Sequence, residues 1–142
     1  MKELEIRQVK TKEELNQVFE IRKQVFIEEQ NVPYALEMDG LDSEAVQIIA
    51  FFNNKPVGCA RLRTNHCVKL ERIAILKEYR KRGFGKQITD YLIDYCKKKE
   101  YNEICLHSQT YISDFYEKLG FKKRGKQFLE AGTEHIEMYM KI

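Results

Sequence analysis

The chain has 142 residues, of which 43% are hydrophobic and 33% charged, with 7 glycines and 2 prolines. This length and composition suit one compact domain over residues 1–142 and exclude disordered, collagen-like and low-complexity classes. The net charge of +3, from 25 basic and 22 acidic residues, is too small to indicate a nucleic-acid partner.

The longest apolar run, residues 48–52, is far shorter than the roughly 20 residues that span a bilayer. The charged amino-terminal segment also lacks the apolar stretch of a secretory signal. We therefore expect a cytoplasmic protein with no membrane partner. The four cysteines are widely spaced, without a CxxC pair, and predict reduced thiols and no metal site: Cys59, Cys67, Cys96 and Cys105.

The first elements in chain order are a strand, a long helix and a loop. Alternating residues predict a short strand over 4–6. Thr11 followed by Glu14 forms a capping box, which predicts a helix from about residue 12 to the high twenties. Residues 31–43 contain a proline, a glycine and three acidic residues, and they are predicted to form a loop.

Strands and helices alternate in the rest of the chain. Apolar segments at 45–52 and 57–63 flank a turn and predict a β-hairpin. A further strand over 68–76 precedes an amphipathic helix over 84–99. The remaining expected elements are a strand at 103–107, a helix at 111–119 and strands at 121–126 and 134–142. This order predicts a mixed α/β domain built around one sheet.

The segment RKRGFGK, residues 80–86, joins a predicted strand to a predicted helix. Gly83 and Gly85 allow a tight turn and close approach of a ligand, while the first helical amides have no partner within the helix. With the neighbouring cations, this arrangement predicts a diphosphate site. The segment matches neither GxxxxGK[ST] nor GxGxxG. The structural alternative is that the glycines only start a helix among solvated charges.

Two motifs resemble those of the GNAT superfamily of N-acetyltransferases. Arg80-x-x-Gly83-x-Gly85 resembles its [RQ]xxGx[GA] acyl-CoA signature, preceded by a similar strand at 70–75. Residues 107–109 and 115–121 resemble its second cofactor segment.

Other segments resemble the ElaA-like branch, so that the resemblance covers nearly the whole chain. These segments are residues 25–30, the acidic residues Glu37, Asp39 and Asp42, and residues 130–132 with His135. Glu134 departs from that pattern, where a proline is expected.

The resemblance implies the GNAT acyl-CoA N-acyltransferase fold, in which one central mixed sheet of six to seven strands is flanked by helices. Acetyl-CoA would bind in a splay between the strand of Ile73 and that of Leu106. The residues expected to bind it are Ile73, Ala74, Ile75, Arg80, Lys81, Arg82, Gly83, Phe84, Gly85, Lys86 and Gln109.

The implied activity is direct transfer of an acetyl group to a primary amine of a small molecule or protein. Tyr116 matches the tyrosine that protonates the departing thiolate, although its hydroxyl could instead satisfy a buried acceptor. Glu71 lies two residues before Ile73, on the same strand face, and is the candidate general base. An exposed strand glutamate is the structural alternative. His135 could relay protons or be structural.

Three acidic residues are expected to line the acceptor site: Glu28, Glu29 and Glu37. Glu28 and Glu29 are also the next candidates for the general base. Acidic side chains there would favour a cationic amine, although a solvated loop explains them as well. Arg22 interrupts the apolar helix face, where it could pair with an acid of the loop or extend to solvent. Superfamily members are often dimers, so a homodimer is expected only from the resemblance.

Two other functions compete with acetyl transfer. Arg22, Val25 and Phe26, followed by the acids of the 31–43 loop, resemble acyl-homoserine-lactone synthases, which use an acylated carrier protein and S-adenosylmethionine. The acyl-CoA signature at residues 80–85 argues against that function. The third class is a non-catalytic acyl-CoA sensor, which would keep the binding turn without turnover.

Overall fold

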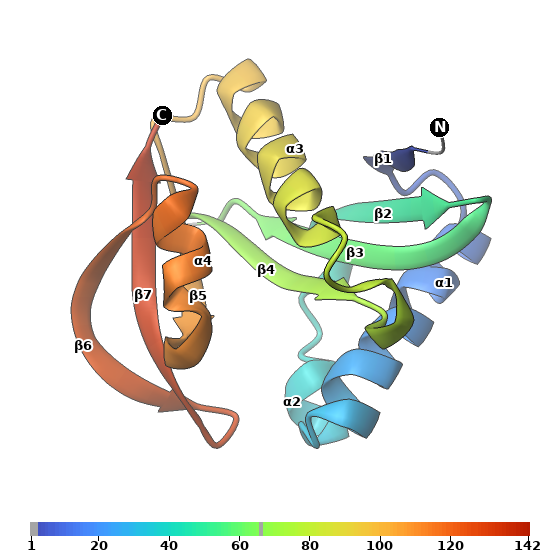
Figure 1. Ribbon diagram of the computed structural model, residues 1–142, viewed down its shortest axis with the longest axis horizontal. Helices are drawn as coiled ribbons and strands as arrows, with labels where there is room; N and C mark the ends of the chain where they lie inside the picture. The colour runs from blue at the N-terminus through green and yellow to red at the C-terminus, as the bar shows by residue number, and fades with distance from the viewer. Residues whose placement is uncertain (1–2, 66) are drawn as a thin grey trace.

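The computed structural model describes residues 3–65 and 67–142 (Figure 1). Its strands are β1 (Leu4–Gln8), β2 (Val46–Phe52), β3 (Lys55–Arg63), β4 (Val68–Ile75), β5 (Glu103–Gln109), β6 (Lys122–Glu130) and β7 (Thr133–Lys141). Its α-helices are α1 (Lys12–Arg22), α2 (Tyr34–Glu37), α3 (Phe84–Lys98) and α4 (Ser113–Lys118). A π-helical segment, Lys23–Glu29, continues α1, so the predicted long helix is confirmed with a change of winding.

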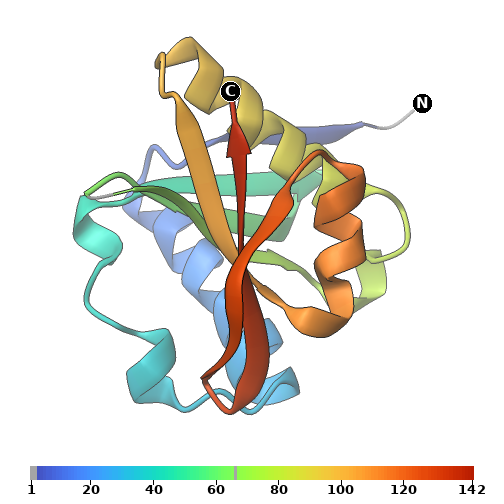
Figure 2. The ribbon, with the colours of Figure 1, turned by 90° about the vertical axis from the view of Figure 1, so that its left-hand side faces the viewer.

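All seven strands form one sheet in the order β1-β2-β3-β4-β5-β7-β6. Within the described residues, every neighbouring pair is antiparallel except β4 and β5, which are parallel. The sheet therefore has two halves, and Figure 2 shows β5 and β7 running steeply across the direction of β2 and β3. The predicted mixed sheet is confirmed.

Local sequence explains several boundaries. The Thr11 hydroxyl accepts a hydrogen bond from the Glu14 amide at 3.1 Å, while the Glu14 carboxylate accepts one from the Lys10 amide at 2.8 Å. These contacts satisfy free amides at the start of α1. Asn53 and Asn54 adopt positive φ values of 53° and 64°, as the tight turn between β2 and β3 requires. The segment predicted as a plain loop contains α2, which sequence patterning did not indicate.

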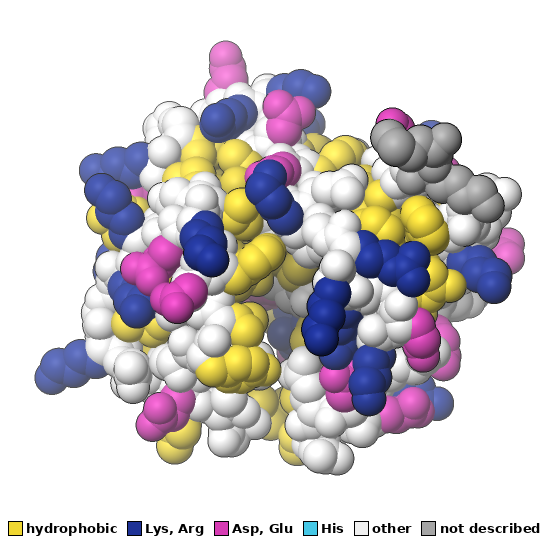
Figure 3. All heavy atoms as spheres, in the orientation of Figure 1, with side chains coloured by type: hydrophobic (Ala, Val, Ile, Leu, Met, Phe, Trp, Pro, Cys, Tyr) yellow, Lys and Arg dark blue, Asp and Glu magenta, His cyan; other side chains and the backbone are white. Residues whose placement is uncertain are grey.

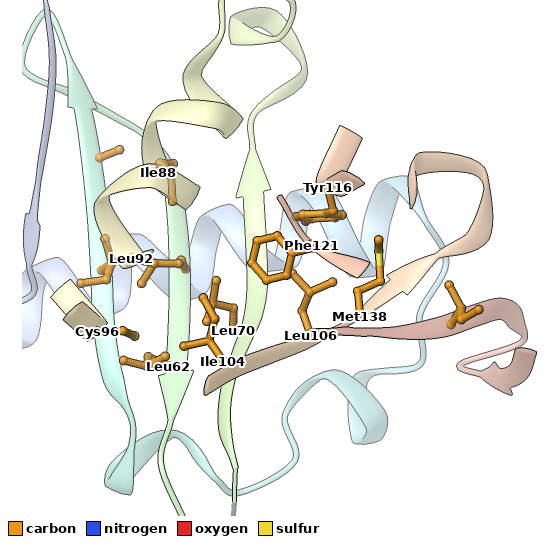
Figure 4. Packing of buried hydrophobic residues seen from close by; sticks show 14 residues of the cluster. Leu62, Leu70, Ile88, Leu92, Cys96, Ile104, Leu106, Tyr116, Phe121 and Met138 are labelled. Atoms are coloured by element: carbon orange, nitrogen blue, oxygen red, sulfur yellow. The ribbon is translucent and has the colours of Figure 1, made fainter. Parts of the chain in front are cut away.

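Helices cover both faces of the sheet. On one face, α3 packs Ile88, Leu92 and Cys96 against alternate residues of the strands, including Leu62 and Leu70 (Figure 4). On the other face, Val18, Ile21 and Val25 pack against Ile49, Cys59 and Ala74. Alternation with a period of two along the strands explains the two separate cores.

Among the described residues, no helix combines the length and the apolar character needed to cross a membrane.

Candidate functional site

The sheet opens into a fork between β4 and β5. The strands pair only over residues 68–70 and 104–106, although β4 continues to Ile75 and β5 to Gln109. Beyond the paired residues, backbone groups of β4 that would face a neighbouring strand face the fork instead. They are available to a ligand that takes the place of a strand. The fork lies where the sequence predicts a splay.

A β-bulge in β4 contributes to this opening. Arg72 has a φ of 53°, and the β3–β4 register shifts between Cys59 and Arg61. The left-handed conformation costs a residue other than glycine about 1–2 kcal/mol. The Arg72 guanidinium donates hydrogen bonds to the backbone oxygens of Leu36 at 3.2 Å and Glu37 at 3.1 Å. The same residue thus bends β4 and holds α2 beside the fork.

The glycine turn at residues 80–86 lies at the far end of β4. Lys81 and Gly83 have positive φ values of 65° and 79°, and α3 begins at Phe84. Because Gly83 has no side chain to cap the helix, the first amides of α3 remain available to an anion. A Cβ at Gly85 would meet the Phe115 ring at 3.7 Å, which is ordinary contact. Packing of the described residues therefore does not require glycine at position 85.

Arg80 fixes this turn instead of presenting a free cation. Its Nε donates to the backbone oxygen of Ile75 at 2.9 Å, and its terminal nitrogens pair with the Glu29 carboxylate at 2.6 and 2.7 Å. The hydrogen bond from Arg80 lowers the pKa of Glu29. Glu29 therefore anchors the turn, and its predicted contact with substrate is not supported.

Two adjoining cavities, of about 350 and 680 Å³, occupy the fork and share Gln30, Ile73 and Arg80. The space-filling view shows the hollow between the halves of the molecule (Figure 3). The smaller cavity is lined by most of the predicted cofactor residues: Ile73, Ala74, Ile75, Arg80, Lys81, Gly83, Phe84, Gly85 and Lys86. Gln109 lines the larger cavity.

Arg82 is the predicted cofactor residue that lines neither cavity. Its guanidinium packs over the rings of Phe52 and Tyr79, at 5.7 and 5.4 Å from their centroids. The prediction counted Arg82 with its neighbours because they are adjacent in sequence. The left-handed residues of the turn direct its side chain elsewhere.

Tyr116 lies on α4 and lines the larger cavity. Its ring packs edge-on against Phe115 and Phe121, and only 8% of the residue is exposed. Burial raises the pKa of its hydroxyl to about 12. The group is therefore a proton donor at neutral pH.

A cluster of buried charged side chains lies beside the larger cavity. We call it the ionic cluster; its members are Arg22, Glu37, Asp39, Asp42, Arg61, Arg63, Lys69, Glu71 and Arg72. The guanidinium groups of Arg22 and Arg61 are almost completely buried. Charges this deep are tolerable only when they are paired, and each carboxylate in the cluster contacts at least two cations.

Glu71 belongs to this cluster, which argues against the predicted role of general base. Its carboxylate lies 2.5 Å from Arg61, 2.7 Å from Arg63 and 3.1 Å from Lys69. Burial acts to raise the pKa of Glu71, but hydrogen bonds from Arg63 and Arg61 outweigh it and lower the pKa to about 2. A carboxylate that is so weakly basic is a poor proton acceptor at neutral pH.

The other predicted acceptor-site acids are also engaged. Glu37 borders the larger cavity, but its two carboxylate oxygens each lie 2.6 Å from an arginine nitrogen, one of Arg22 and one of Arg72. Glu28 lies outside both cavities and is 4.0 Å from Lys23. The expectation of a cationic acceptor therefore loses its support, because these acids already have cationic partners.

A second polar group on the cavity wall was not predicted as a unit. Nδ1 of His107 lies 2.9 Å from Glu130, and Nε2 of His135 lies 3.8 Å from the same carboxylate. The Phe128 ring contacts both imidazoles. The pairing of β5 and β6 with β7 brings these residues together. Among the described residues, no group of three or more His, Cys, Asp or Glu side chains has the geometry to hold a metal ion.

Comparison with known proteins agrees with this geometry. The family model described as "Acetyltransferase (GNAT) domain" matches residues 6–142. A Bacillus subtilis protein named as an acetyltransferase is 41% identical over 139 residues, which cover 95% of each chain. The crystal structure of Escherichia coli ElaA superposes with a TM-score of 0.85 at 24% identity and covers 99% of both chains. An Elizabethkingia anophelis GNAT structure with acetyl-CoA bound has a TM-score of 0.76 at 18% identity and covers 98% of both chains.

Proposed function

Because the chain belongs to the GNAT acetyltransferase family, we propose that it is an acetyl-CoA-dependent N-acetyltransferase acting on a primary amine by direct attack. One observation carries the proposal: two adjoining cavities connect the glycine turn before α3, the open edge of β4 and Tyr116. The smaller cavity is lined by the turn, the larger by Tyr116, and both by Ile73 of β4. This arrangement offers an extended site with an anion-binding end and a reacting end.

The residues fit coenzyme A. Open amides at the start of α3, with Lys81 and Lys86 nearby, suit a diphosphate. The unpaired edge of β4 around Ile73 suits the amide-bearing pantetheine arm, because the strand edge and the arm each offer N–H and C=O groups. Acetyl-CoA would supply the activated acetyl group. The acetyl-CoA-bound structure from Elizabethkingia anophelis supports this assignment at the level of the fold.

The chemistry needs a neutral amine and a proton for the leaving sulfur. A free alkylamine with a pKa near 10.4 is neutral in only about one molecule in a few thousand at pH 7. Tyr116 can donate a hydrogen bond to the sulfur, because its hydroxyl keeps its proton at neutral pH. Tyr116 lines the larger cavity together with Ile73 of β4.

We assign the proton-accepting role to His135 in place of Glu71. Nδ1 of His135 lies 2.8 Å from the backbone oxygen of Thr133. A carbonyl oxygen only accepts hydrogen bonds, so Nδ1 carries the hydrogen and Nε2 is the nitrogen that can take a proton. Glu130, next to Nε2, would stabilise the imidazolium that forms. His135 lines the larger cavity together with Tyr116.

A small-molecule amine suits the acceptor side better than a protein. The larger cavity of about 680 Å³ lies within the usual range for small-molecule sites, roughly 300–1,000 Å³. Its ionic cluster is internally paired, so selection of an acceptor would depend on shape and on the polar groups of His107, Gln109 and Glu130.

The proposal is tested by calorimetry with coenzyme A and by a thiol-release assay with acetyl-CoA over a panel of small amines. Tyr116→Phe should keep coenzyme A affinity and lose about 100-fold in kcat, as expected for a general acid. His135→Gln, which removes the proposed proton acceptor, should lower kcat and keep coenzyme A affinity. Tyr95→Phe, on α3 outside both cavities, is the matched control and should be unaffected.

Three outcomes would contradict this function. Absence of coenzyme A binding to the folded chain would remove the cofactor. Binding without turnover of any amine would favour an acyl-CoA sensor. Thermal stabilisation by S-adenosylmethionine, and not by coenzyme A, would favour the acyl-homoserine-lactone synthase alternative.

A further inference from the structure

Cys67 and Cys105 form a close pair of thiols that acetyl transfer does not use. Their Sγ atoms lie 2.9 Å apart, compared with about 2.05 Å in a disulfide bond. Cys67 is exposed, immediately before β4, whereas Cys105 is buried in β5. The sequence predicts four separate reduced thiols because 38 positions separate these two residues.

This pair lies at the root of the fork. Val68 to Leu70 pair with Ile104 to Leu106, and this short segment is the direct backbone link between β4 and β5. Side chains alternate along a strand, so Cys67 shares a face of β4 with Lys69, and Cys105 shares a face of β5 with His107. Lys69 and His107 both line the larger cavity. The two thiols therefore lie beside the candidate site, next to the short β4–β5 ladder, although neither lines a cavity.

We propose that Cys67 and Cys105 are an oxidation site, where a peroxide converts the two thiols into a disulfide that staples β4 to β5. The Cys67 thiol loses its proton, and the thiolate attacks one peroxide oxygen. The O–O bond breaks, a sulfenic acid forms, and the departing hydroxide takes up the thiol proton and leaves as one water. Cys105 sulfur then attacks the Cys67 sulfur, the S–S bond forms, and the hydroxyl leaves with the Cys105 proton as a second water. Two thiols are oxidised and one peroxide is reduced to two waters.

Burial sets the order of these steps. Cys67 is exposed and is reached first by an oxidant in solution. Burial raises the pKa of the Cys105 thiol to about 12, and the neighbouring Cys67 adds to this effect. Cys105 thus stays protonated and unreactive until a sulfenic acid forms beside it. A disulfide that forms in this way is typical of redox-responsive sites in reducing compartments.

The expected consequence is a stiffer fork. The bond would close a long loop between strands that share a short ladder, and it would restrict movement between the two halves of the sheet. Loop closure of this length should raise Tm by about 10 °C. Backbone amides of residues 68–70 should exchange with solvent more slowly in the oxidised form. Neither effect depends on acetyl transfer.

The test uses the full chain, fully reduced and then treated with a small excess of hydrogen peroxide. We expect loss of two titratable thiols, a Cys67–Cys105 link in the peptide map, and the rise in Tm reversed by a reductant. Cys67→Ser should abolish all three effects. Cys96→Ala, on the buried face of α3 and away from the pair, should retain them.

Other results would overturn the proposal. A Cys67–Cys67 dimer, or oxidation of Cys67 to sulfinic acid while Cys105 stays a thiol, would show that the pair does not close. A second variant, Cys105→Ala, keeps the exposed thiol and should accumulate a sulfenic acid that dimedone traps. Equal trapping in the parent protein would show that Cys105 does not resolve it.

Discussion

The glycine turn before α3 and the ionic cluster beside the larger cavity differ in whether their charged and polar groups are already paired. In the cluster, buried side-chain charges are paired with one another: Arg61 contacts Asp39, Asp42 and Glu71 within 3.1 Å. At the turn, polar backbone groups at the start of α3 are left open beside Gly83. The first region uses its charges to hold the fold, and the second keeps its donors for a ligand.

This contrast shows that the number of charged residues near a cavity does not reveal what the cavity binds. Five cations and four carboxylates lie together in the ionic cluster. Their mutual pairing leaves little net field for a substrate. At the turn, by contrast, the helix dipole and the open amides at the start of α3 produce a directed positive potential.

Removal of one charge from the cluster should have the largest effect. Arg61→Met leaves Asp39 and Glu71 without their shared buried partner, and we expect a loss of about 3–5 kcal/mol in the free energy of unfolding. Urea unfolding measures it. Lys98→Met, which breaks an exposed pair with Asp94 on α3, should leave the urea midpoint unchanged. Equal midpoints for both variants would show that the cluster does not stabilise the fold.

Acid should weaken the same cluster. The pKa of Glu71 is about 2 in the folded chain against an ordinary 4.5, so its contribution is complete above about pH 5 and declines as the pH falls through 2. The full contribution is about 3 kcal/mol. The stability difference between parent and Glu71→Gln should therefore be largest at pH 7 and shrink toward pH 2. A difference that is constant across this range would show that Glu71 has no low pKa.

The two regions also differ in how well the sequence predicts them. The turn follows from contiguous residues: glycines, cations and the boundary between strand and helix all occur within residues 80–86. The backbone conformation of the turn can therefore be predicted from the sequence. The capping contact of Thr11 was predictable for the same reason, because its partner Glu14 is three residues away.

The ionic cluster could not be predicted, because its partners are distant in sequence. Arg22 contacts Glu37 and Asp42, which are 15 and 20 positions away. The sequence allows Arg22 either to pair or to reach solvent, and only the docking of α2 decides between them. The left-handed conformation of Arg72 reverses the expected alternation along β4. The role assigned to Glu71 depended on that alternation and on knowing which cations surround it.

Gly85→Val offers the smallest effect and the most specific test of the turn. Valine has a helix propensity slightly better than that of glycine, and the nearest described neighbour of the new Cβ lies at 3.7 Å, so the free energy of unfolding should change by less than about 0.5 kcal/mol. The side chain would occupy the anion-binding end of the smaller cavity, which Gly85 lines. We expect coenzyme A affinity to fall by about 10-fold or more, equivalent to at least about 1.4 kcal/mol, as measured by calorimetry.

Gly125→Val is the matched control, because its φ of 79° strains any side chain and its position in β6 lies outside both cavities. It should lower Tm and leave the affinity for coenzyme A unchanged. Gly85→Val should therefore change binding but hardly change stability, whereas Gly125→Val should change stability but not binding. If Gly85→Val bound coenzyme A as well as the parent, the open amides of α3 would not be the binding site. The turn and the ionic cluster would then differ only in how they are built into the fold, and not in whether they bind this ligand.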